Sequence, residues 1–167
     1  ARASANYVAA NGASSDTRTG GFATDDAGGT GTLQLGWEGE NWGVAALYSK
    51  VQNGQDLIVY ATPFVKDRFS DRGVTHAYAL GGFWQPLESG WLPSLSLGWG
   101  INQSDTQRKG QVRNSQSWRA GLEWSDVLMA GNNAGMAVGQ PVFATDLRCV
   151  DTPADGQFIW EWWYQFQ

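Results

Sequence analysis

The sequence is poor in cysteine, in charge and in long apolar runs, and each shortage excludes something. Cys149 is the one cysteine, so the chain cannot form an internal disulfide. No apolar run approaches the roughly 18 residues of a membrane-spanning helix, and the mean hydropathy is −0.36. The net charge of −5 and the pI near 4.7 argue against a nucleic-acid-binding protein.

A signal peptide is also missing, because residues 1–10 contain no apolar central region. We therefore expect either that the chain was processed or that it is a fragment of a longer protein. The length of 167 residues predicts a single domain, spanning 1–167, that is large enough to bury a core.

Glycine and tryptophan are abundant, with 22 and 10 residues, and the clearest pattern lies at the end of the chain. Every second residue from 158 to 166 is aromatic, whereas the alternate positions include three polar residues, Glu161, Gln165 and Gln167. A period of two indicates a β-strand, because successive side chains of a strand point to opposite faces. The aromatic face turns inward in a soluble sandwich and outward to lipid in a membrane barrel.

The same alternation predicts an all-β chain of about eight strands with no helix. The expected strands are 1–10, 31–38, 42–50, 74–85, 94–101, 115–125, 134–140 and 157–167, with a possible short strand at 57–65. Opposite the large residues, these strands carry mainly Gly, Ala and Ser, and the charges are concentrated in loops. Small residues make a poor solvent face for a soluble sheet, so the pattern favours an antiparallel up-and-down transmembrane β-barrel over a soluble β-sandwich.

The connections and the aromatic residues support this interpretation. Long connections at 11–30, 51–73, 102–114 and 141–156 alternate with short ones at 39–41, 86–93 and 126–133, which places all long loops at one end of a meander. Trp and Tyr favour the membrane–water boundary. We predict two aromatic girdles, with Trp37, Trp42, Trp84 and Trp124 beside the short turns and Tyr48, Tyr78, Trp118 and Trp160 near the long loops; Trp162 is a further girdle residue.

Gly and Ser cannot fill the interior of a closed eight-stranded barrel. We therefore expect the strands to form part of a wider barrel with a water-filled lumen, or several copies to close a barrel together. The polar residues expected to face the lumen are Gln34, Glu38, Arg119, Glu123, Glu161 and Gln165. Charges at these positions either sort ions at a constriction or form wall contacts without effect on flux.

Three segments resemble the cyanobacterial branch of the carbohydrate-selective porin family. They are AGMAVGQP at 134–141, DTPADGQFIWEWWYQFQ at 151–167, and SWRAGLEW at 117–124 followed by Asp126 and Val127. The resemblance covers most of the chain and is most specific in its last third. It implies a bacterial outer membrane, a barrel of about sixteen strands of which this chain is the C-terminal part, and a homotrimer.

The family name suggests carbohydrates as solutes, whereas its cyanobacterial branch is associated more with inorganic ions, iron included. Members of this branch also carry a surface-layer-homology domain and a coiled coil before the barrel, and neither is present here. In the family more strands follow the segment that matches 160–166, which supports the expectation of a fragment. The implied partners are outer-membrane lipid, a trimer of the same chain, and small solutes or ions in transit.

Catalytic and metal sites are not predicted, and we expect neither a cofactor nor an enzyme. No spacing places two carboxylates around a cleft as a glycosidase requires. Asp151 and Asp155 lack the alternating spacing of a calcium site and are interpreted as an acidic surface loop. His76 is interpreted as a rim or packing residue, and Cys149 as a bystander.

Three functions remain open from the sequence. The first is a porin wall segment for passive diffusion of small hydrophilic solutes or inorganic ions. The second is a soluble carbohydrate-binding β-sandwich whose exposed Trp residues stack on sugars. The third is a structural outer-membrane barrel without transport. Dependence on detergent separates the second from the others, and channel conductance separates the first from the third.

Overall fold

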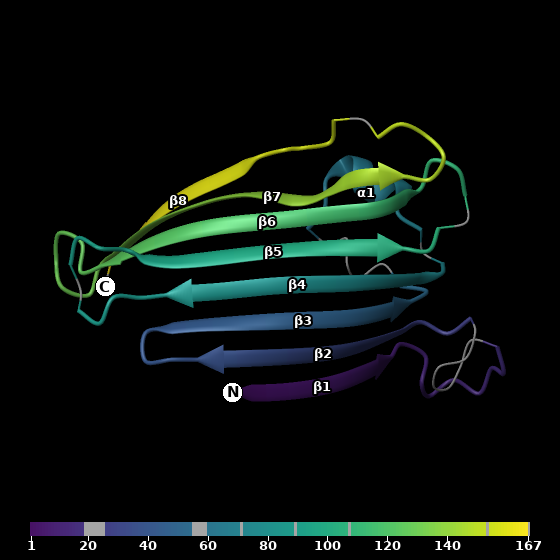
Figure 1. Cartoon of the computed structure of the whole chain (residues 1–167), viewed down its shortest axis with the longest axis horizontal. Helices are drawn as coiled ribbons and strands as arrows, with labels where there is room; N and C mark the ends of the chain where they lie inside the picture. Colours follow the sequence, from purple (N-terminus) through teal and green to yellow (C-terminus); the bar gives the residue numbers. More distant parts are fainter. Residues whose placement is uncertain are drawn as a thin grey trace.

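The computed structural model describes residues 1–18, 26–54, 60–70, 72–88, 90–106, 108–152 and 154–166. Eight antiparallel strands form one sheet in the order of the chain, as Figure 1 shows. The elements are β1 (Arg2–Ala9), β2 (Gly29–Glu38), β3 (Trp42–Gln52), α1 (Pro63–Arg68), β4 (Val74–Trp84), β5 (Ser94–Ser104), β6 (Val112–Ser125), β7 (Asn133–Leu147) and β8 (Ile159–Gln165). The predicted all-β, up-and-down antiparallel arrangement is confirmed.

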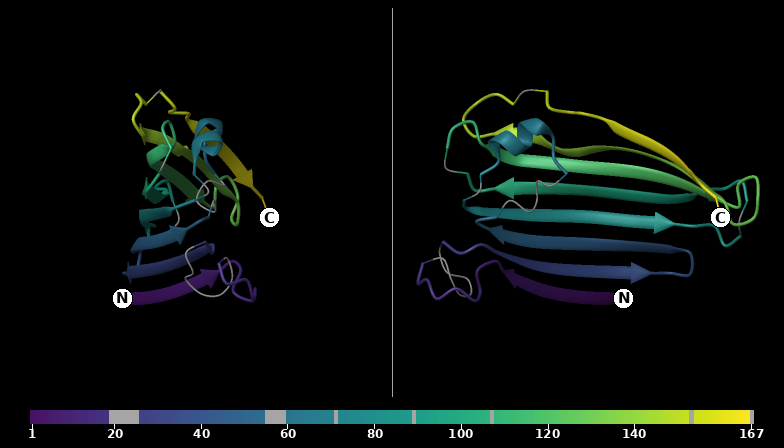
Figure 2. Two further views of the ribbon diagram at one scale, coloured as in Figure 1. Left: turned by 90° about the vertical axis from the view of Figure 1, so that its right-hand side faces the viewer. Right: turned by 180° about the vertical axis from the view of Figure 1, so that it is seen from behind.

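The sheet is open, because β1 and β8 are its two edges and do not pair with each other. It curves around α1, so that the helix lies on its inner, concave side (Figure 2). Every strand reverses the direction of the one before it. The turns 39–41, 85–93 and 126–132 therefore lie at one end of the sheet, and the remaining connections lie at the other end, with α1 (Figure 1).

The predicted alternation of long and short connections is only partly right. The connections 10–28, 53–73 and 148–158 are long, but 105–111 is shorter than the turn 85–93. The difference arises because β5 continues to Ser104 and β6 already begins at Val112. Polar residues occupy these strand ends, so hydropathy alone does not distinguish them from a loop.

Strand β7 is also longer than predicted, since it continues through Pro141 to Leu147 instead of ending at Gln140. The pairing between β6 and β7 shifts register between the pairs Gln116–Phe143 and Trp118–Gln140, which leaves one extra residue on β7. Such a bulge tolerates proline, which cannot donate a backbone hydrogen bond.

The expectation of a chain without helix is wrong at 63–68, where α1 forms. Its N-terminus follows standard capping chemistry, because the Thr62 side chain accepts a hydrogen bond from the backbone N–H of Val65 and Pro63 occupies the first turn. The predicted short strand at 57–65 is replaced by this helix over 63–65, and residues 57–59 lie outside the described part of the chain. No helix in the described ranges is both long and apolar enough to cross a membrane.

The main buried cluster lies between α1 and the concave face, at the end with the long loops. Val65 and Val112 are fully buried there, and Ala61, Phe69, Ala144 and Leu147 complete the cluster. The cluster packs a segment of the β3–β4 loop against β6 and β7. Strands β4 and β5 lie between β3 and β6 in the sheet, so the loop crosses both of them.

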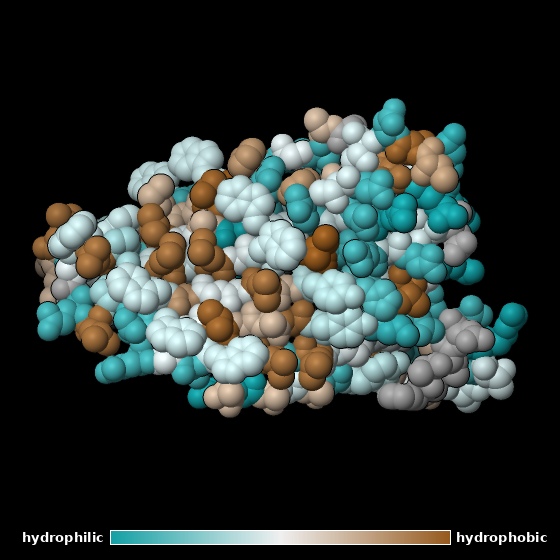
Figure 3. Space-filling model, in the orientation of Figure 1, coloured by the Kyte–Doolittle hydropathy of each residue, from teal (hydrophilic) through white to brown (hydrophobic). Residues whose placement is uncertain are grey.

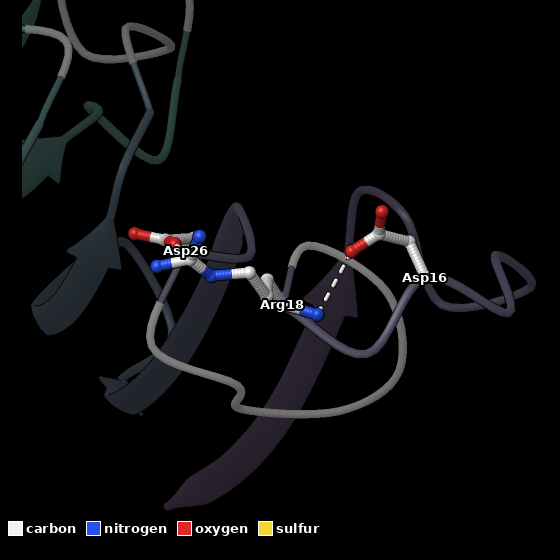
Figure 4. A network of polar contacts seen from close by, with 3 residues as sticks. All are labelled: Asp16, Arg18 and Asp26. Carbon is white, nitrogen blue, oxygen red and sulfur yellow. Dashed lines mark hydrogen bonds and ion pairs between the residues drawn. The ribbon is translucent and has the colours of Figure 1, made fainter.

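The β1–β2 loop is held differently. Arg18 donates its backbone N–H to Asp16 over 2.8 Å, and its side chain lies 3.9 Å from the Asp26 carboxylate (Figure 4). Both side chains of the ion pair are largely exposed, at 83% and 54%. An exposed pair at this distance contributes little stability, so the contact between Arg18 and Asp26 is a weak anchor compared with the buried cluster under α1.

Candidate functional site

The two faces of the sheet differ sharply in chemistry. Cross-strand partners in the register place most of the large apolar residues of β2 to β8 on the convex face, and the concave face is mainly small and polar apart from Leu47, Phe83, Ile159 and Trp163. The exposed large residues of the convex face are Leu33, Leu35, Trp37, Trp42, Val44, Tyr78, Leu80, Trp84, Leu95, Leu97, Trp99, Met136, Val138, Trp160, Trp162 and Tyr164.

Figure 3 looks onto the convex face, where aliphatic side chains and rings cover the strands from β2 to β8. Leu97 in the middle of this face is 53% exposed and Trp162 is 72% exposed. A single aromatic side chain carries about 150–250 Å², whereas soluble monomers rarely expose apolar patches larger than a few hundred Å². A soluble sandwich would cover such a face with a second sheet, but the described strands all belong to one sheet.

The apolar band of the convex face ends in polar residues near the long loops. Lys50 pairs with His76, and His76 pairs with Gln103 on the next strand. One step closer to the middle, the rings of Tyr48 and Tyr78 are 5.2 Å apart, and the Tyr48 hydroxyl is 2.8 Å from Nδ1 of His76. The boundary thus consists of amphipathic rings that face apolar residues on one side and polar residues on the other.

All the predicted girdle residues lie on the convex face. Trp42 pairs directly with Trp84, and Trp118 pairs with Trp99. The indole N–H of Trp118 donates to Oε1 of Gln140 over 2.7 Å, so this ring keeps its one polar group satisfied. The register, however, places Trp160 in the row that also contains Trp37, through Val44, Gly82, Leu97, Ala120 and Val138. The assignment of these two residues to opposite girdles therefore requires strands tilted to the membrane normal, and the girdles stay a prediction.

The concave face is lined by hydroxyl and amide groups that bond across the strands. Thr32 and Ser49 are 2.8 Å apart through their side-chain oxygens, and the Asn102 amide donates to Ser115 over 3.2 Å. A third contact of this kind, at 2.9 Å, joins the side chains of Thr75 and Ser104. These short polar side chains leave space above the sheet because they reach only to their neighbours.

Arg119 is the most prominent charge on the open part of the concave face. Its cross-strand partners are Gly98 on β5 and Gly139 on β7. The guanidinium stem lies over Gly98, where an added Cβ would be only 3.2 Å from Nε. No ion pair or hydrogen bond of the Arg119 side chain is present within the described residues. Its positive charge is therefore available to a solute.

The other residues predicted to face a lumen also occupy concave positions, but only some lie close together. Gln34, Arg119 and Glu161 line the same open hollow. Glu38 lines a second hollow with Gln34 and Arg119, and it pairs with Arg2 of β1 at 3.2 Å, with both side chains exposed. Glu123 is four residues from Arg119 along one strand, or about 13 Å, and no ion pair joins them in the described structure.

Gln165 lies at the turn end of β8, opposite Asn133 of β7. Glu161 instead pairs with Ala137, four residues further from the turn end of β8 than Gln165. Of the six predicted residues, Gln34 and Arg119 line two adjoining hollows, one shared with Glu161 and the other with Glu38, while Glu123 and Gln165 lie nearer the turn end of their strands.

A part of the β3–β4 loop bonds to the exposed edge of β7. The pairing of β7 with β8 stops at Gly139, which leaves the following β7 residues without a strand partner on that side. Ala61 forms a parallel bridge with Val142 there. The Thr62 N–H donates to the Val142 carbonyl and the Val142 N–H donates to the Tyr60 carbonyl, each over 2.9 Å. The loop thus runs from β3 to β7 across the intervening strands and narrows the concave side.

Asp155 holds this loop in place. Its Oδ2 accepts a hydrogen bond from the Thr62 hydroxyl at 2.7 Å and from the Ala144 backbone N–H at 2.9 Å. The carboxylate therefore joins the helix cap, strand β7 and the β7–β8 connection. The interpretation of Asp155 as a surface acid is wrong, because this residue is buried; Asp151 is exposed as expected.

The sequence interpretation missed α1, Thr62 and the role of Asp155. A threonine followed by a proline is a recognisable start of a helix, so Thr62-Pro63 was an available signal. Nothing local to 151–156 indicates the contact of Asp155, whose partner Thr62 is 93 residues away.

Metal or nucleophilic chemistry has little support on this surface. No group of three or more His, Cys, Asp or Glu side chains that could hold a metal ion occurs in the described ranges. Cys149 is exposed in the β7–β8 connection, and the His76 ring contacts Tyr48. In the described residues the arrangement offers an exposed apolar surface and a polar hollow.

Comparison with known proteins adds no relative: no family model, no curated protein and no solved structure matches the chain. The function of the chain is therefore inferred from the chemistry of the two faces of the sheet.

Proposed function

We propose that this chain forms part of the wall of a transmembrane β-barrel in a bacterial outer membrane, a porin for passive diffusion of small hydrophilic solutes and inorganic ions. The observation that carries the proposal is the exposed apolar convex face opposite a small and polar concave face. In a barrel wall the convex face contacts hydrocarbon and the concave face lines water.

The strand dimensions support this proposal. β2 has 10 residues, and β3, β4 and β5 have 11 each. A tilted strand of about 9–11 residues crosses a bilayer. The polar row of Lys50, His76 and Gln103 then lies at the headgroup level on the side of the long loops.

The open edges indicate that the wall needs more strands than this chain supplies. Gly and Ser on the concave face leave a wide interior, so closure by further strands of the same protein or by further copies fits better than an eight-stranded barrel. The trimer and the barrel of about sixteen strands implied by the family resemblance belong to the same proposal.

Flux through the barrel is restricted by the docked loop. α1 and the segment 60–62 occupy the concave side at the end with the long loops, and Asp155 fastens them to β7. Beyond this narrowing, solutes meet Arg119 and Glu161, which present opposite charges in the hollow that also contains Gln34. Charged side chains along a pore bias the passage of ions.

The test is conductance of the purified full-length protein in a planar lipid bilayer. We expect insertion from detergent and discrete conductance steps. Insertion into vesicles without conductance would favour a structural barrel. A protein that stays monodisperse without detergent and binds immobilised carbohydrate would contradict the membrane assignment and favour a soluble sugar-binding sheet.

A further inference from the structure

Two neighbouring turns at the end opposite α1 carry large apolar side chains that nothing in the described chain covers. The turn 85–93 exposes Leu87, Trp91 and Leu92, and the turn 126–132 exposes Leu128 and Met129. Trp91 is 84% and Leu128 is 89% exposed, more than the large residues on the strands. We call these two segments the apolar turn pair.

Hairpin closure does not require such residues. The turn 39–41, at the same end of the sheet, consists of Gly39, Glu40 and Asn41 and has no apolar side chain. In the described residues of the apolar turn pair, Glu88 and Asp126 are the only charged groups. A turn at this end of the sheet can therefore close without exposed apolar side chains, so those of the apolar turn pair need another explanation.

The turn 126–132 holds its apolar residues in a braced conformation. Asp126 accepts a hydrogen bond from the Gly131 N–H over 2.8 Å. From β8, the Tyr164 hydroxyl accepts a bond from the Asn132 amide over 2.6 Å and donates to the Val127 carbonyl over 3.2 Å. Leu128 and Met129 project from this fixed frame.

The backbone at Leu128 adds a second indication. Its φ of 64° lies in the left-handed region, which disfavours a leucine relative to glycine or asparagine. The side chain gains no contact inside the chain that would offset this unfavourable conformation, since it is almost fully exposed. Unfavourable backbone conformations at exposed residues often mark positions that act on a partner.

The apolar turn pair is continuous with the convex face. The indole N–H of Trp124, on the convex face of β6, donates to the Trp91 carbonyl over 3.0 Å and so ties the first turn to the second hairpin. Tyr164, which braces the second turn, also belongs to the convex face of β8. Both turns therefore extend the apolar surface beyond the ends of the strands (Figure 3).

We propose that the apolar turn pair inserts into the lipid bilayer at the boundary between headgroups and acyl chains, on the side of the membrane opposite the long loops. This inference rests on the proposed membrane function and deepens it. Because the turns carry Glu88 and Asp126 and lack cations in their described residues, insertion depends on apolar burial and requires no anionic lipid. The wall is thereby anchored at one end by Trp91, Leu128 and Met129 in addition to the strand residues.

The experiment uses a single environment-sensitive fluorophore on cysteine in the full chain, reconstituted into phosphatidylcholine vesicles. Native Cys149, at the end with the long loops, provides one labelled position. In a Cys149→Ser background, Leu128→Cys reports the turn and Leu97→Cys reports the middle of the convex face. Quenchers attached to lipid at shallow and deep positions, and iodide in water, locate each label.

We expect shallow lipid quenchers to act on position 128, deep ones on position 97, and iodide on position 149. Lipid quenching at 97 with iodide quenching at 128 would overturn the inference and leave the membrane wall intact. Iodide quenching at both positions would contradict both proposals. Crosslinking between two copies through position 128, with no quenching by lipid, would show a second chain as the occupant and also overturn the inference.

A second variant separates lipid contact from turn structure. Leu128→Asn with Met129→Ser removes the apolar side chains, while asparagine tolerates the left-handed backbone better than leucine. We expect unchanged secondary structure in detergent and a loss of shallow lipid quenching at a label on Trp91→Cys. Unchanged quenching at that label would contradict cooperation of the two turns in one lipid-embedded surface. The matched control is Asn41→Ser, in the polar turn 39–41, which should leave the quenching as it is.

Discussion

The convex and concave faces belong to the same eight strands, yet they follow opposite packing rules. On the convex face, large side chains such as Leu97 and Trp162 stay exposed although they lie in regular, well-paired strands. On the concave face, by contrast, several residues are buried: Val112, Ala144 and Leu147 lie under α1, and Ser49, Val51, Thr75 and Ala77 lie on β3 and β4. The apolar side chains of the convex face require another apolar phase or surface to cover them. The concave face is already partly covered by α1.

The difference in burial between the two faces indicates which contacts stabilise the isolated chain. Burial of apolar area stabilises by about 25 cal/mol per Å², so the small cluster under α1 can contribute only a fraction of what the uncovered convex face could contribute in lipid. Backbone pairing defines the sheet, but the environment of the convex face decides how stable it is.

A charge in the middle of each face gives the largest expected contrast. Leu97→Arg places a guanidinium on the convex face, and we expect a loss of about 2–4 kcal/mol in folding free energy in a bilayer, the amount found for arginine near the midplane of barrels. Urea titration of the vesicle-reconstituted protein measures it. Ser96→Arg, on the neighbouring concave position, is the control and should cost much less. Equal losses for both variants would remove the distinction between the faces.

Release of the docked loop tests the concave side. Asp155→Ala leaves the Thr62 hydroxyl and the Ala144 N–H without their acceptor, and each unsatisfied buried group costs about 1–3 kcal/mol. We expect faster proteolysis within 60–70 and a higher single-channel conductance. The exposed Asp151→Ala is the matched control, expected to change neither. A variant of Asp155 with unchanged proteolysis and conductance would argue against a docked constriction.

Reversal of the charge at Arg119 tests whether this side chain affects ion preference in the open hollow. Two unit charges 4 Å apart in water interact by about 1 kcal/mol, which corresponds to about a fivefold change in local ion preference. Because the reversal replaces a repulsion of cations by an attraction, we expect Arg119→Glu to raise the cation-to-anion permeability ratio by at least that factor, measured from reversal potentials in a salt gradient. Arg113→Ala is the control, because Arg113 pairs with Asp146 at 3.6 Å near the long loops. An unchanged permeability ratio would show that Arg119 is a wall residue without effect on ion flux.

The smallest effect is expected outside both faces. Arg18→Ala removes the exposed ion pair with Asp26 in the β1–β2 loop, and the folding free energy should change by no more than about 0.5 kcal/mol. Thermal unfolding in detergent measures it. A large loss of stability would show that this loop is anchored as firmly as α1, and the contrast between the two loops would disappear.

Much of the strand arrangement was predictable because its signal is local. The alternation of Leu95, Leu97, Trp99 and Ile101 with small residues assigned both the strand and its faces, and the same rule succeeded at the aromatic end of the chain. Polar strand ends such as 102–104 and the continuation of β7 through Pro141 were missed, because backbone pairing with a neighbour maintains them without an apolar pattern. In the candidate site, the concave positions of Gln34, Arg119 and Glu161 followed from the same alternation.

Local alternation was sufficient to assign most of the strands and the separation of large from small residues, because a period of two acts on each residue through its immediate neighbours. Three features emerged from the folded chain alone: residues 60–68 cross the concave face, Asp155 is buried beneath them, and Gln34 shares a hollow with Arg119. Those contacts join residues far apart in the chain, and their stability depends on the geometry of several strands at once.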